Sequence, residues 1–274
     1  MTIWAHTLVK NEANWIWYAV TSIVGHVDRI LLWDTGSTDG SLEIEKKLEK
    51  EFPEKITLRQ RKQETAEEFT RVRQEMLDET KSDWFIILDG DEIWFEDSIK
   101  KVTRTINEAE GIIESVIVPT INLVGDIFHY QEKAAGRYKF GDKVGHYNLR
   151  AIKRSIPGLH SQGVHGVWGW ADDKGRMIQD RGSYKFVDAP YLHATGLRRS
   201  TADVQVIKRG KKYRYEIGEE FSKDYYYPEA FFRDKPDELI SPWIPIPADY
   251  KFRAFIETPL RKIKRRVWQG RPGY

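Results

Sequence analysis

The stretch Asp89-Gly90-Asp91-Glu92 holds three carboxylates around one glycine. Carboxylates this close repel one another and raise each other's pKa unless a positive charge offsets them. Hard oxygen ligands of this kind favour a divalent cation such as Mg²⁺ or Mn²⁺, and a cation held by Asp91 could bridge two phosphates. The alternative is a polar turn in which Asp and Gly serve only the backbone geometry. These residues alone leave both interpretations open.

The carboxylates follow a strand that the sequence places in the middle of a sheet. Residues 84–88, Trp-Phe-Ile-Ile-Leu, form an apolar run typical of a strand buried on both faces. Strands and helices alternate around it, which implies an α/β fold with a largely parallel sheet. Ligands of such sheets bind beyond the carboxyl ends of the central strands. We expect strands at 3–9, 28–33, 56–59, 84–88, 115–123 and 147–153. We expect four helices: one capped by Asn11, one that follows Ser41, one at about 65–79, and one that begins at Ser98.

Two further loops are expected at the same edge of the sheet, because parallel strands all end on one side. They are residues 9–12 and 34–41, which follow the first two predicted strands. With the acidic motif they offer backbone N–H groups, hydroxyls and carboxylates around one crevice. Asp34 could accept hydrogen bonds from a ribose or a base edge. Helix capping is the alternative for any single residue of the second loop.

Taken together, these motifs resemble family 2 glycosyltransferases, and more narrowly the branch whose strand-end motif is Asp-x-Asp-Glu. The resemblance implies a GT-A fold, which is an α/β, Rossmann-like and mostly parallel sheet flanked by helices, with an irregular acceptor-side C-terminal region. It also implies a nucleoside-diphosphate sugar donor, a divalent metal (Mn²⁺ or Mg²⁺) and inversion at the anomeric carbon. The matching pieces are Lys10-Asn11-Glu12, residues 33–41, Arg73-Gln74 and residues 84–92.

The resemblance also implies roles for single residues. Asp34 would contact the base or ribose, and Arg73 the base or diphosphate, although Gln74 replaces the family's usual Asn. Asp91 would ligate the metal, with Asp89 near the ribose and metal. His193 resembles the late histidine that reaches back to the metal, so the predicted metal set is Asp89, Asp91 and His193. The predicted donor-binding residues are Thr7, Val9, Asn11, Glu12, Asp34, Thr35, Ser37, Arg73, Asp89 and Gly90.

Inversion needs a base that takes the proton of the acceptor hydroxyl. The family tends to use a carboxylate after a Val-His pair, and Gly166 stands at that position here. We therefore predict the base among Asp172, His165 and Glu92. A turn ahead of Lys174 is the alternative for Asp172 and its neighbour. Further candidates are Asp173 and Asp126.

Two tryptophans, Trp168 and Trp170, lie beside the candidate bases in the sequence. Indole faces can stack on the apolar faces of sugar rings while the ring N–H finds a polar partner. We therefore predict that at least one of them lines the acceptor site. Packing in the core is the alternative for both.

The composition of the 274 residues, 40% hydrophobic and 31% charged, is that of a globular protein. Basic and acidic residues number 44 and 42, so net charge gives no reason to expect a nucleic-acid partner. The absence of cysteine excludes disulfides and thiolate metal sites. No signal sequence and no apolar run long enough to cross a membrane are present. We expect a cytoplasmic protein, with peripheral contact to the inner face of a membrane as an open option.

Three parts of the chain are predicted. Residues 1–124 form the nucleotide-sugar-binding half, residues 125–235 the acceptor-side half of the same domain, and residues 236–274 a Pro-rich extended segment with a basic tail. A helix is expected near 201–215. The tail has no acidic residue from Arg261 onward and mixes basic with apolar residues, as an amphipathic segment on an anionic lipid surface does. A solvated helix face packing on the body is the alternative.

The predicted function is that of a metal-dependent inverting, hexosyltransferase-type glycosyltransferase. It would move a sugar from a UDP- or GDP-linked donor to the hydroxyl of a glycan, lipid-linked or lipopolysaccharide acceptor. A sugar-phosphate nucleotidyltransferase is one alternative, although such enzymes usually carry a Gly-rich, basic loop after the first strand, which residues 9–12 do not form. A non-catalytic nucleotide- or carbohydrate-binding protein is another, because Gly166 removes a candidate base.

Overall fold

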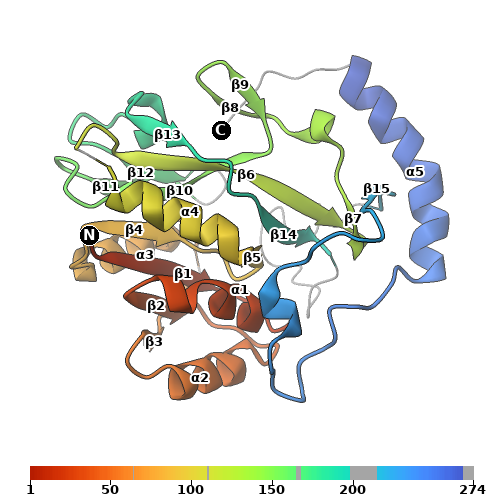
Figure 1. The fold of residues 1–274 in the computed structure, drawn as a ribbon, viewed down its shortest axis with the longest axis horizontal. Coiled ribbons are helices and arrows are strands. Elements are labelled where there is room, and N and C mark those ends of the chain that lie inside the picture. Colours follow the sequence, from red (N-terminus) through yellow and green to blue (C-terminus); the bar gives the residue numbers. More distant parts are fainter. Residues whose placement is uncertain (64, 110, 165–167, 198–214, 268–274) are drawn as a thin grey trace.

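The computed structural model, which describes residues 1–63, 65–109, 111–164, 168–197 and 215–267, is organised around one central β-sheet (Figure 1). The strand order across it is β15-β7-β6-β10-β4-β1-β2-β3. The strands are β1 Ile3–Val9, β2 Arg29–Asp34, β3 Ile56–Gln60, β4 Trp84–Ile87, β5 Glu92–Trp94, β6 Ser115–Val124, β7 Asp126–Tyr130, β8 Tyr138–Phe140, β9 Lys143–Gly145, β10 Tyr147–Lys153, β11 His160–Gln162, β12 Gly169–Ala171, β13 Tyr184–Phe186, β14 Tyr191–Gly196 and β15 Glu219–Glu220. The helices are α1 Ile16–Ile23, α2 Ser41–Glu51, α3 Ala66–Glu79, α4 Glu96–Asn107 and α5 Ala248–Val267, with 3₁₀ turns at Val24–His26, Lys133–Ala135, Ile178–Asp180 and Glu229–Phe232.

The first half of the sheet is parallel, as the sequence predicts. Strand β1 pairs in parallel with β2 and with β4, and β2 pairs in parallel with β3. Every residue of β4 is buried, which confirms that it is the central strand. Strand β10 runs antiparallel to both β4 and β6, so the sheet changes direction beside the central strand. The mixed α/β fold with a mostly parallel sheet flanked by helices is therefore confirmed.

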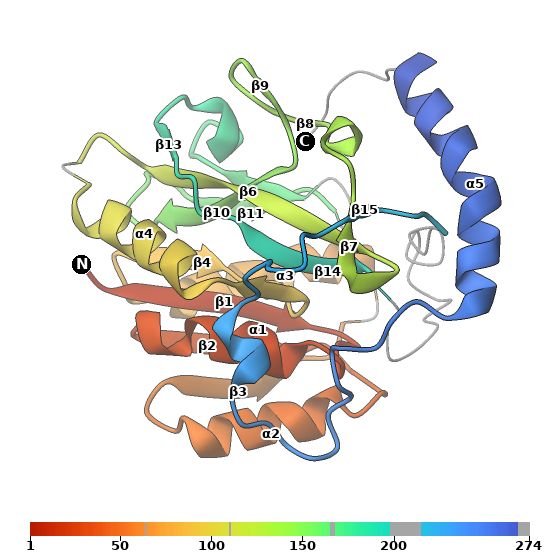
Figure 2. The ribbon, with the colours of Figure 1, turned by 45° about the vertical axis from the view of Figure 1, so that its right-hand side comes forward.

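Successive side chains of β2 point to opposite faces of the sheet, and helices cover both faces. On one face, Leu31 and Trp33 pack with Val72 and Met76 of α3. On the other, Ile30 and Leu32 belong to the cluster that also contains the buried residues of α1 and α4. Figure 2 shows the sheet between these helices. The two helix layers fix the strand ends from which the candidate site is built.

Some helix starts differ from the prediction. Asn11 does not cap α1, which begins at Ile16. It takes a left-handed conformation instead (φ 58°), and its side chain accepts a hydrogen bond from the backbone of Thr38. Helix α4 begins at Glu96, before Ser98. Helix α3 begins where predicted, because Thr65 and Glu68 form a capping box.

The second half of the chain holds more regular structure than its irregular sequence predicts. Strand β14 lies between β5 and β6, antiparallel to the first and parallel to the second. This insertion places His193 opposite both Glu92 and Asn122, although the three residues are far apart in sequence. The helix predicted near 201–215 falls almost wholly outside the described residues. The division of the chain into three parts stays a prediction.

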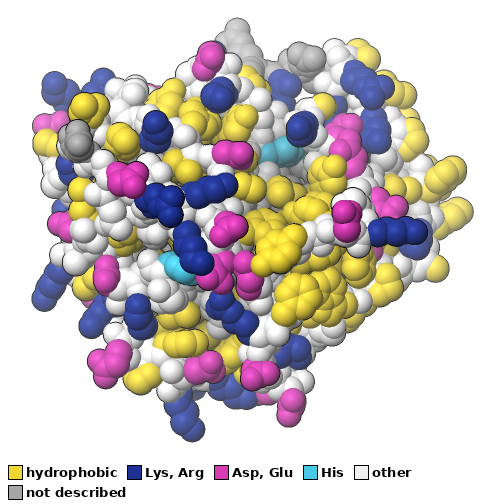
Figure 3. Space-filling view, in the orientation of Figure 1, with side chains coloured by type: hydrophobic (Ala, Val, Ile, Leu, Met, Phe, Trp, Pro, Cys, Tyr) yellow, Lys and Arg dark blue, Asp and Glu magenta, His cyan; other side chains and the backbone are white. Residues whose placement is uncertain are grey.

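Helix α5 lies along the edge of the molecule beside β7 and β15 (Figures 1 and 2). It is longer than the predicted tail segment and begins at Ala248. Hydrophobic side chains gather on the outer edge of the molecule where α5 lies (Figure 3). None of the described helices combines the length and the apolar composition that a membrane crossing requires. The cytoplasmic location stays a prediction.

Candidate active site

A cleft of about 690 Å³ opens beside the carboxyl ends of β1 and β4. Its walls come from the loops after these two strands, from α3, and from β6, β10, β12 and β14. Six residues that the sequence predicts to bind substrate line the cleft, and so do two further predicted metal ligands, one in the acidic motif and one on β14. These residues are Glu12, Arg73, Asp89, Gly90, Trp168 and Trp170, with Asp91 and His193.

The three predicted loops do meet at this edge. The backbone N–H of Asn11 donates to Ser37 Oγ at 2.9 Å, and that of Glu12 donates to Ser41 Oγ at 2.8 Å. Gly90 of the third loop approaches Glu12 so closely that a Cβ on Gly90 would lie 3.1 Å from Glu12 Cγ. The predicted convergence of the loops is confirmed.

Asp34 does not face the cleft, contrary to the prediction. Its side chain is buried, and its carboxylate accepts hydrogen bonds from the backbone N–H groups of Gly36 (2.8 Å) and Ser37 (3.1 Å). The Thr35 hydroxyl likewise donates to the backbone of Val9 at 2.7 Å. These contacts hold the backbone of the loop, as the alternative to ligand binding predicts for its residues. The other predicted donor residues that do not line the cleft are Thr7, Val9, Asn11, Thr35 and Ser37.

Two arginines neutralise part of the acidic motif. The Asp89 carboxylate lies 3.3 Å from Arg73 Nη2 and 3.2 Å from Arg150 Nη2. Arg150 also pairs with the fully buried Glu92 and donates from Nε to the Tyr191 hydroxyl at 3.0 Å. Burial acts to raise the pKa of Asp89, but the charges of Arg150 and Arg73 outweigh it and lower that pKa. Of the three carboxylates of the acidic motif, Asp89 and Glu92 thus have arginine partners, and the need for a cation to offset repulsion rests on Asp91.

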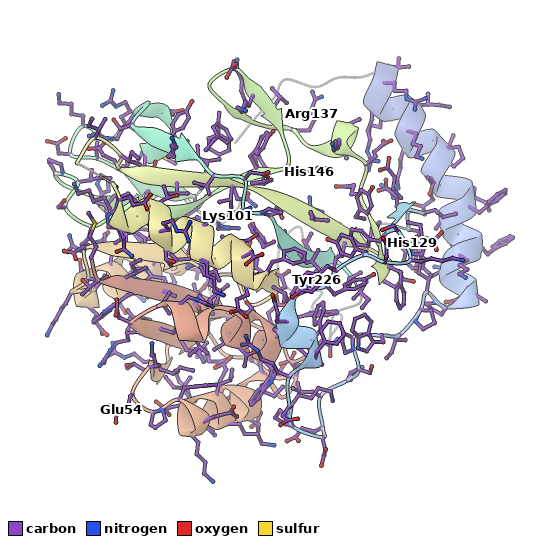
Figure 4. The ribbon with its side chains drawn as sticks, viewed as in Figure 1. Glu54, Lys101, His129, Arg137, His146 and Tyr226 are labelled. Carbon is purple, nitrogen blue, oxygen red and sulfur yellow. The ribbon has the colours of Figure 1, made fainter. Side chains whose placement is uncertain are left out.

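A chain of hydrogen bonds leads from Asp91 into the second half of the protein. Asp91 Oδ1 lies 3.3 Å from His193 Nε2, and His193 Nδ1 lies 3.2 Å from Asn122 Oδ1. Asn122 Nδ2 is 2.9 Å from His146 Nδ1, and His146 Nε2 is 3.0 Å from the carbonyl oxygen of Glu132. Figure 4 labels His146, beside β6. The chain joins a cleft carboxylate to a backbone carbonyl.

The carbonyl of Glu132 sets the direction of every bond in this chain. A carbonyl oxygen only accepts, so His146 Nε2 must carry its proton. Burial lowers the pKa of His146, so the ring is neutral and its Nδ1 accepts from the Asn122 amide. Asn122 Oδ1 is then left to accept from His193 Nδ1. The lone pair of a neutral His193 is thereby directed from Nε2 toward Asp91.

The state of His193 follows from its neighbours. Burial by itself lowers the pKa of His193, but the charge of Asp91 and its hydrogen bond outweigh burial and raise that pKa. A cation between Asp91 and Nε2 would replace the proton. In the described parts of the chain, no three His, Asp or Glu side chains converge as a metal-binding group. The predicted metal set of Asp89, Asp91 and His193 stays a prediction, and within it Asp89 pairs with Arg73 and Arg150 while Asp91 pairs with His193.

Asp172 is not suited to act as the base. Its side chain is fully buried, and its carboxylate accepts from the backbone N–H groups of Lys174 (3.0 Å) and Arg176 (2.9 Å) and pairs with Arg181. Burial acts to raise the pKa of Asp172, but hydrogen bonds from Arg176, Arg181 and Lys174 lower it to about 2. The turn interpretation therefore replaces the catalytic one.

Three of the remaining candidate bases, Glu92, Asp126 and Asp173, do not line the cleft. Burial raises the pKa of Glu92 to about 7 against the charge of Arg150, and no part of Glu92 is exposed. Asp126 is buried and accepts hydrogen bonds from Phe128 and Ile246. Asp173 is exposed but does not line the cleft. His165 lies outside the described residues. The structure leaves the base unassigned.

The two tryptophans differ in their surroundings. Trp168 is partly exposed, donates to Ser161 Oγ at 2.6 Å, and lies 5.2 Å from the guanidinium of Arg73. Trp170 is buried and packs edge-on against Phe85. Both border the cleft. Trp168 offers a face to a ligand, whereas the burial of Trp170 fits the core-packing alternative.

Several site residues were not predicted, and Arg150 is the most informative of them. It stands between Leu149 and Ala151 in a strand that reads as buried, and a charged residue at such a position requires a partner. That conflict is a signal in the sequence. No such signal distinguishes Asn122 or Tyr191. Other unpredicted residues that line the cleft are Lys10, Gln131, Asn148 and Glu216.

Glu45 provides a test of the electrostatics beside the donor loop. Its side chain on α2 is fully buried, and neither carboxylate oxygen has a partner among the described residues. Burial and the nearby charges of Asp34 and Asp39 raise its pKa from 4.5 to about 9. Between these values the folded protein holds a proton that the unfolded chain releases, so the stability associated with Glu45 declines as pH rises from 4.5 toward 9.

We expect Glu45→Gln to increase the free energy of unfolding at neutral pH by on the order of 2–3 kcal/mol. The gain should disappear below pH 4.5, where both states are protonated. Urea denaturation at the two pH values measures it. Glu51→Gln, an exposed position on the same helix that is not among the charges acting on Glu45, is the control and should change little. A gain that is equal at both pH values would refute the assignment.

Comparison with family models supplies the class of the protein. Residues 6–162 match the model of glycosyl transferase family 2, which is more than half of the chain. The chain therefore belongs to glycosyltransferase family 2, and the resemblance seen in the sequence is confirmed.

Solved structures give more distant similarities. S. aureus TarS 1-349 is 11% identical to this chain with a TM-score of 0.45, and the match covers 71% of this chain and 61% of that chain. Its complex with UDP-GlcNAc is 11% identical with a TM-score of 0.49, and that match covers 76% of this chain and 61% of that chain. Glucosyl-3-phosphoglycerate synthase from Mycobacterium tuberculosis, in complex with Mn²⁺ and UDP-Glc, is 18% identical with a TM-score of 0.42. That match covers 70% of this chain and 71% of the synthase chain. The chain thus spans about 61% of the length of the first of these structures. None of the curated proteins compared with the chain matches it.

Proposed function

We propose that the protein is a metal-dependent, inverting glycosyltransferase that uses a nucleoside-diphosphate sugar, linked to UDP or GDP, as donor. Family membership supports the reaction class. The observation that carries the rest is the pairing of Asp91 with His193 in a cleft at the carboxyl edge of the sheet. A hydroxyl of a glycan, lipid-linked or lipopolysaccharide molecule is the proposed acceptor.

In this proposal Asp91 and His193 Nε2 are the residues that would hold Mn²⁺ or Mg²⁺ beside the donor's diphosphate. A carboxylate oxygen and an imidazole nitrogen are both suitable ligands for Mn²⁺. When bound, the cation stabilises the negative charge that grows on the departing diphosphate. Asp89 stays ionised and fixed between Arg73 and Arg150, and its oxygens would accept hydrogen bonds from the donor's ribose.

Asn122 acts as a positioning residue in this arrangement. Its amide oxygen, 3.2 Å from His193 Nδ1, fixes the tautomer that presents Nε2 to the cation. We expect Asn122→Ala to weaken Mn²⁺ binding by about 10- to 100-fold, the range typical of groups that orient a metal ligand. Titration calorimetry with Mn²⁺ and UDP measures the effect directly. Asn107→Ala, an exposed change on α4, is the matched control; equal affinity in the two variants would contradict the role.

Trp168 is proposed to form part of the acceptor side of the cleft. We expect Trp168→Ala to raise the acceptor KM by about tenfold, because stacking on the acceptor sugar is lost, while the donor KM stays unchanged. Steady-state kinetics with each substrate varied in turn measures the two constants. Trp4→Ala, a partly buried change on β1 away from the cleft, is the control. A rise confined to the donor KM would move Trp168 to the donor side.

The reaction itself is tested by incubating the protein with UDP- and GDP-sugars in the presence of Mn²⁺ or a chelator. Metal-dependent release of nucleoside diphosphate supports the proposal. A nucleotidyltransferase would instead release pyrophosphate from a nucleoside triphosphate and a sugar phosphate. A protein that binds nucleotide sugars without releasing nucleoside diphosphate would be the non-catalytic alternative.

A further inference from the structure

Helix α5 presents an apolar stripe to the solvent. Phe252, Ile256, Leu260, Ile263 and Val267 follow one another at steps of four, four, three and four residues, which places them along one side of a helix. Each is exposed, from 54% for Ile256 to 81% for Val267. Figure 3 shows the hydrophobic side chains at this edge of the molecule. The stripe consists of residue types that normally lie in a core.

The opposite side of α5 is the one that holds it to the body. Tyr250, Ala254, Thr258, Arg261 and Arg265 repeat the same steps two residues earlier, which is about 200° around the helix. Tyr250, Ala254 and Thr258 are buried, and Thr258 Oγ1 accepts from the backbone of Ile217 at 2.8 Å. The stripe is therefore not the packing face of the helix.

Cations flank the stripe on both sides. At 100° per residue, Lys264 falls on one side of it and Lys262 and Arg266 on the other. The ion pairs of α5 with described residues are those of Arg261 with Glu257 and of Arg265 with Glu132 and Glu216. The three flanking cations take no part in these pairs, so their charge is free to meet anionic groups outside the protein.

We propose that α5 docks on the surface of an anionic lipid bilayer, with the stripe among the acyl chains and the flanking cations at the headgroups. An apolar strip edged by lysine and arginine suits a lipid interface. Protein interfaces are depleted of lysine and normally bury more than about 1,000 Å² over a complementary surface, which a single convex helix does not offer. The helix is about 30 Å long, enough for a contact of several turns with a membrane.

Docking through α5 would also place the cleft near the membrane. Arg265 donates to Glu216 at 2.7 Å, and Glu216 lines the cleft. The identity of the acceptor is the one step here that rests on the proposed function: if that function holds, the acceptor is a lipid-linked molecule. Membrane docking itself does not depend on the donor chemistry.

Co-sedimentation of the full chain with vesicles tests the proposal. The vesicles contain equimolar phosphatidylglycerol and phosphatidylcholine, or phosphatidylcholine alone. Two double variants address the surface: Leu260→Ser with Ile263→Ser for the stripe, and Lys262→Glu with Lys264→Glu for the charges. The matched controls are Ile112→Ser with Val144→Ser, and Lys46→Glu with Lys50→Glu, all at exposed positions outside α5.

We expect the unmodified chain and both controls to sediment with the anionic vesicles, less so in high salt and least with phosphatidylcholine alone. Each α5 variant should bind at least about tenfold more weakly. Circular dichroism confirms that the variants fold, and the charge variant changes only surface residues. Equal binding by variants and controls, or no binding by the unmodified chain, would overturn the proposal. So would a dimer in solution that the stripe variant dissociates, because the stripe would then cover a second copy. Nucleoside-diphosphate release, measured separately, reports on the proposed function.

Discussion

Replacing Asp91 with Asn is expected to lower sugar transfer by about 10³-fold or more, because the change removes the carboxylate that, with His193, is proposed to hold the cation. The amide keeps the shape of the side chain but provides no charge for a cation. His193 also loses the charge that raises its pKa, so its pKa should fall. Initial rates at saturating Mn²⁺ and donor measure the loss.

The matched control for Asp91→Asn is Asp97→Asn, an exposed change in the first turn of α4. It should leave the rate unchanged. Urea denaturation should show that both variants remain folded, since Asn at position 91 removes a charge from the interior without leaving a cavity. A rate within a factor of about ten of the unmodified enzyme would remove Asp91 from the chemistry.

Arg150→Met is expected to reduce the free energy of unfolding by about 3–5 kcal/mol, the usual loss when one member of a buried ion pair is removed. Arg150 contacts Asp89, Glu92 and Tyr191 at once. Without it, the buried carboxylate of Glu92 loses its ion-pair partner. Arg150 therefore stabilises the floor of the cleft as well as the acidic motif.

The pH dependence of this loss follows from Glu92. Its pKa of about 7 in the folded protein lies above the ordinary 4.5, so ionisation of Glu92 costs stability as pH rises through that value. The loss caused by Arg150→Met should be larger above pH 7 than below pH 4.5. Adding Glu92→Gln should restore part of the stability at the higher pH. Denaturation curves that show the same loss at both pH values, with no restoration, would contradict this account.

The sequence predicts the parallel half of the fold well because its signals there are local. The run of five apolar residues before Asp89 predicts a buried strand, and its first four residues form β4. Thr65 with Glu68 marks the start of α3 without reference to the rest of the chain. The meeting of the three loops then follows from the direction of the strands. These expectations need no knowledge of long-range contacts.

Predictions about single side chains were less accurate because the alternatives differ only in tertiary contacts. Asp34 could face a ligand or its own loop, and the backbone N–H groups of Gly36 and Ser37 decide for the loop. The acidic motif suggested a shortage of positive charge, which Arg73 and Arg150 supply from distant positions. The partners of His193 depend on the insertion of β14 between β5 and β6, which no local pattern indicates.

Binding of UDP and GDP with and without Mn²⁺, followed by thermal shift in the unmodified protein and in Asp91→Asn, tests the central claim most directly. Ligands that bind the folded state raise its melting temperature by mass action. We predict that one of the two nucleotides raises the melting temperature only when Mn²⁺ is present, and that the rise vanishes with a chelator and in the variant. A rise of equal size without the metal, or in Asp91→Asn, would contradict the account, as would no rise with either nucleotide.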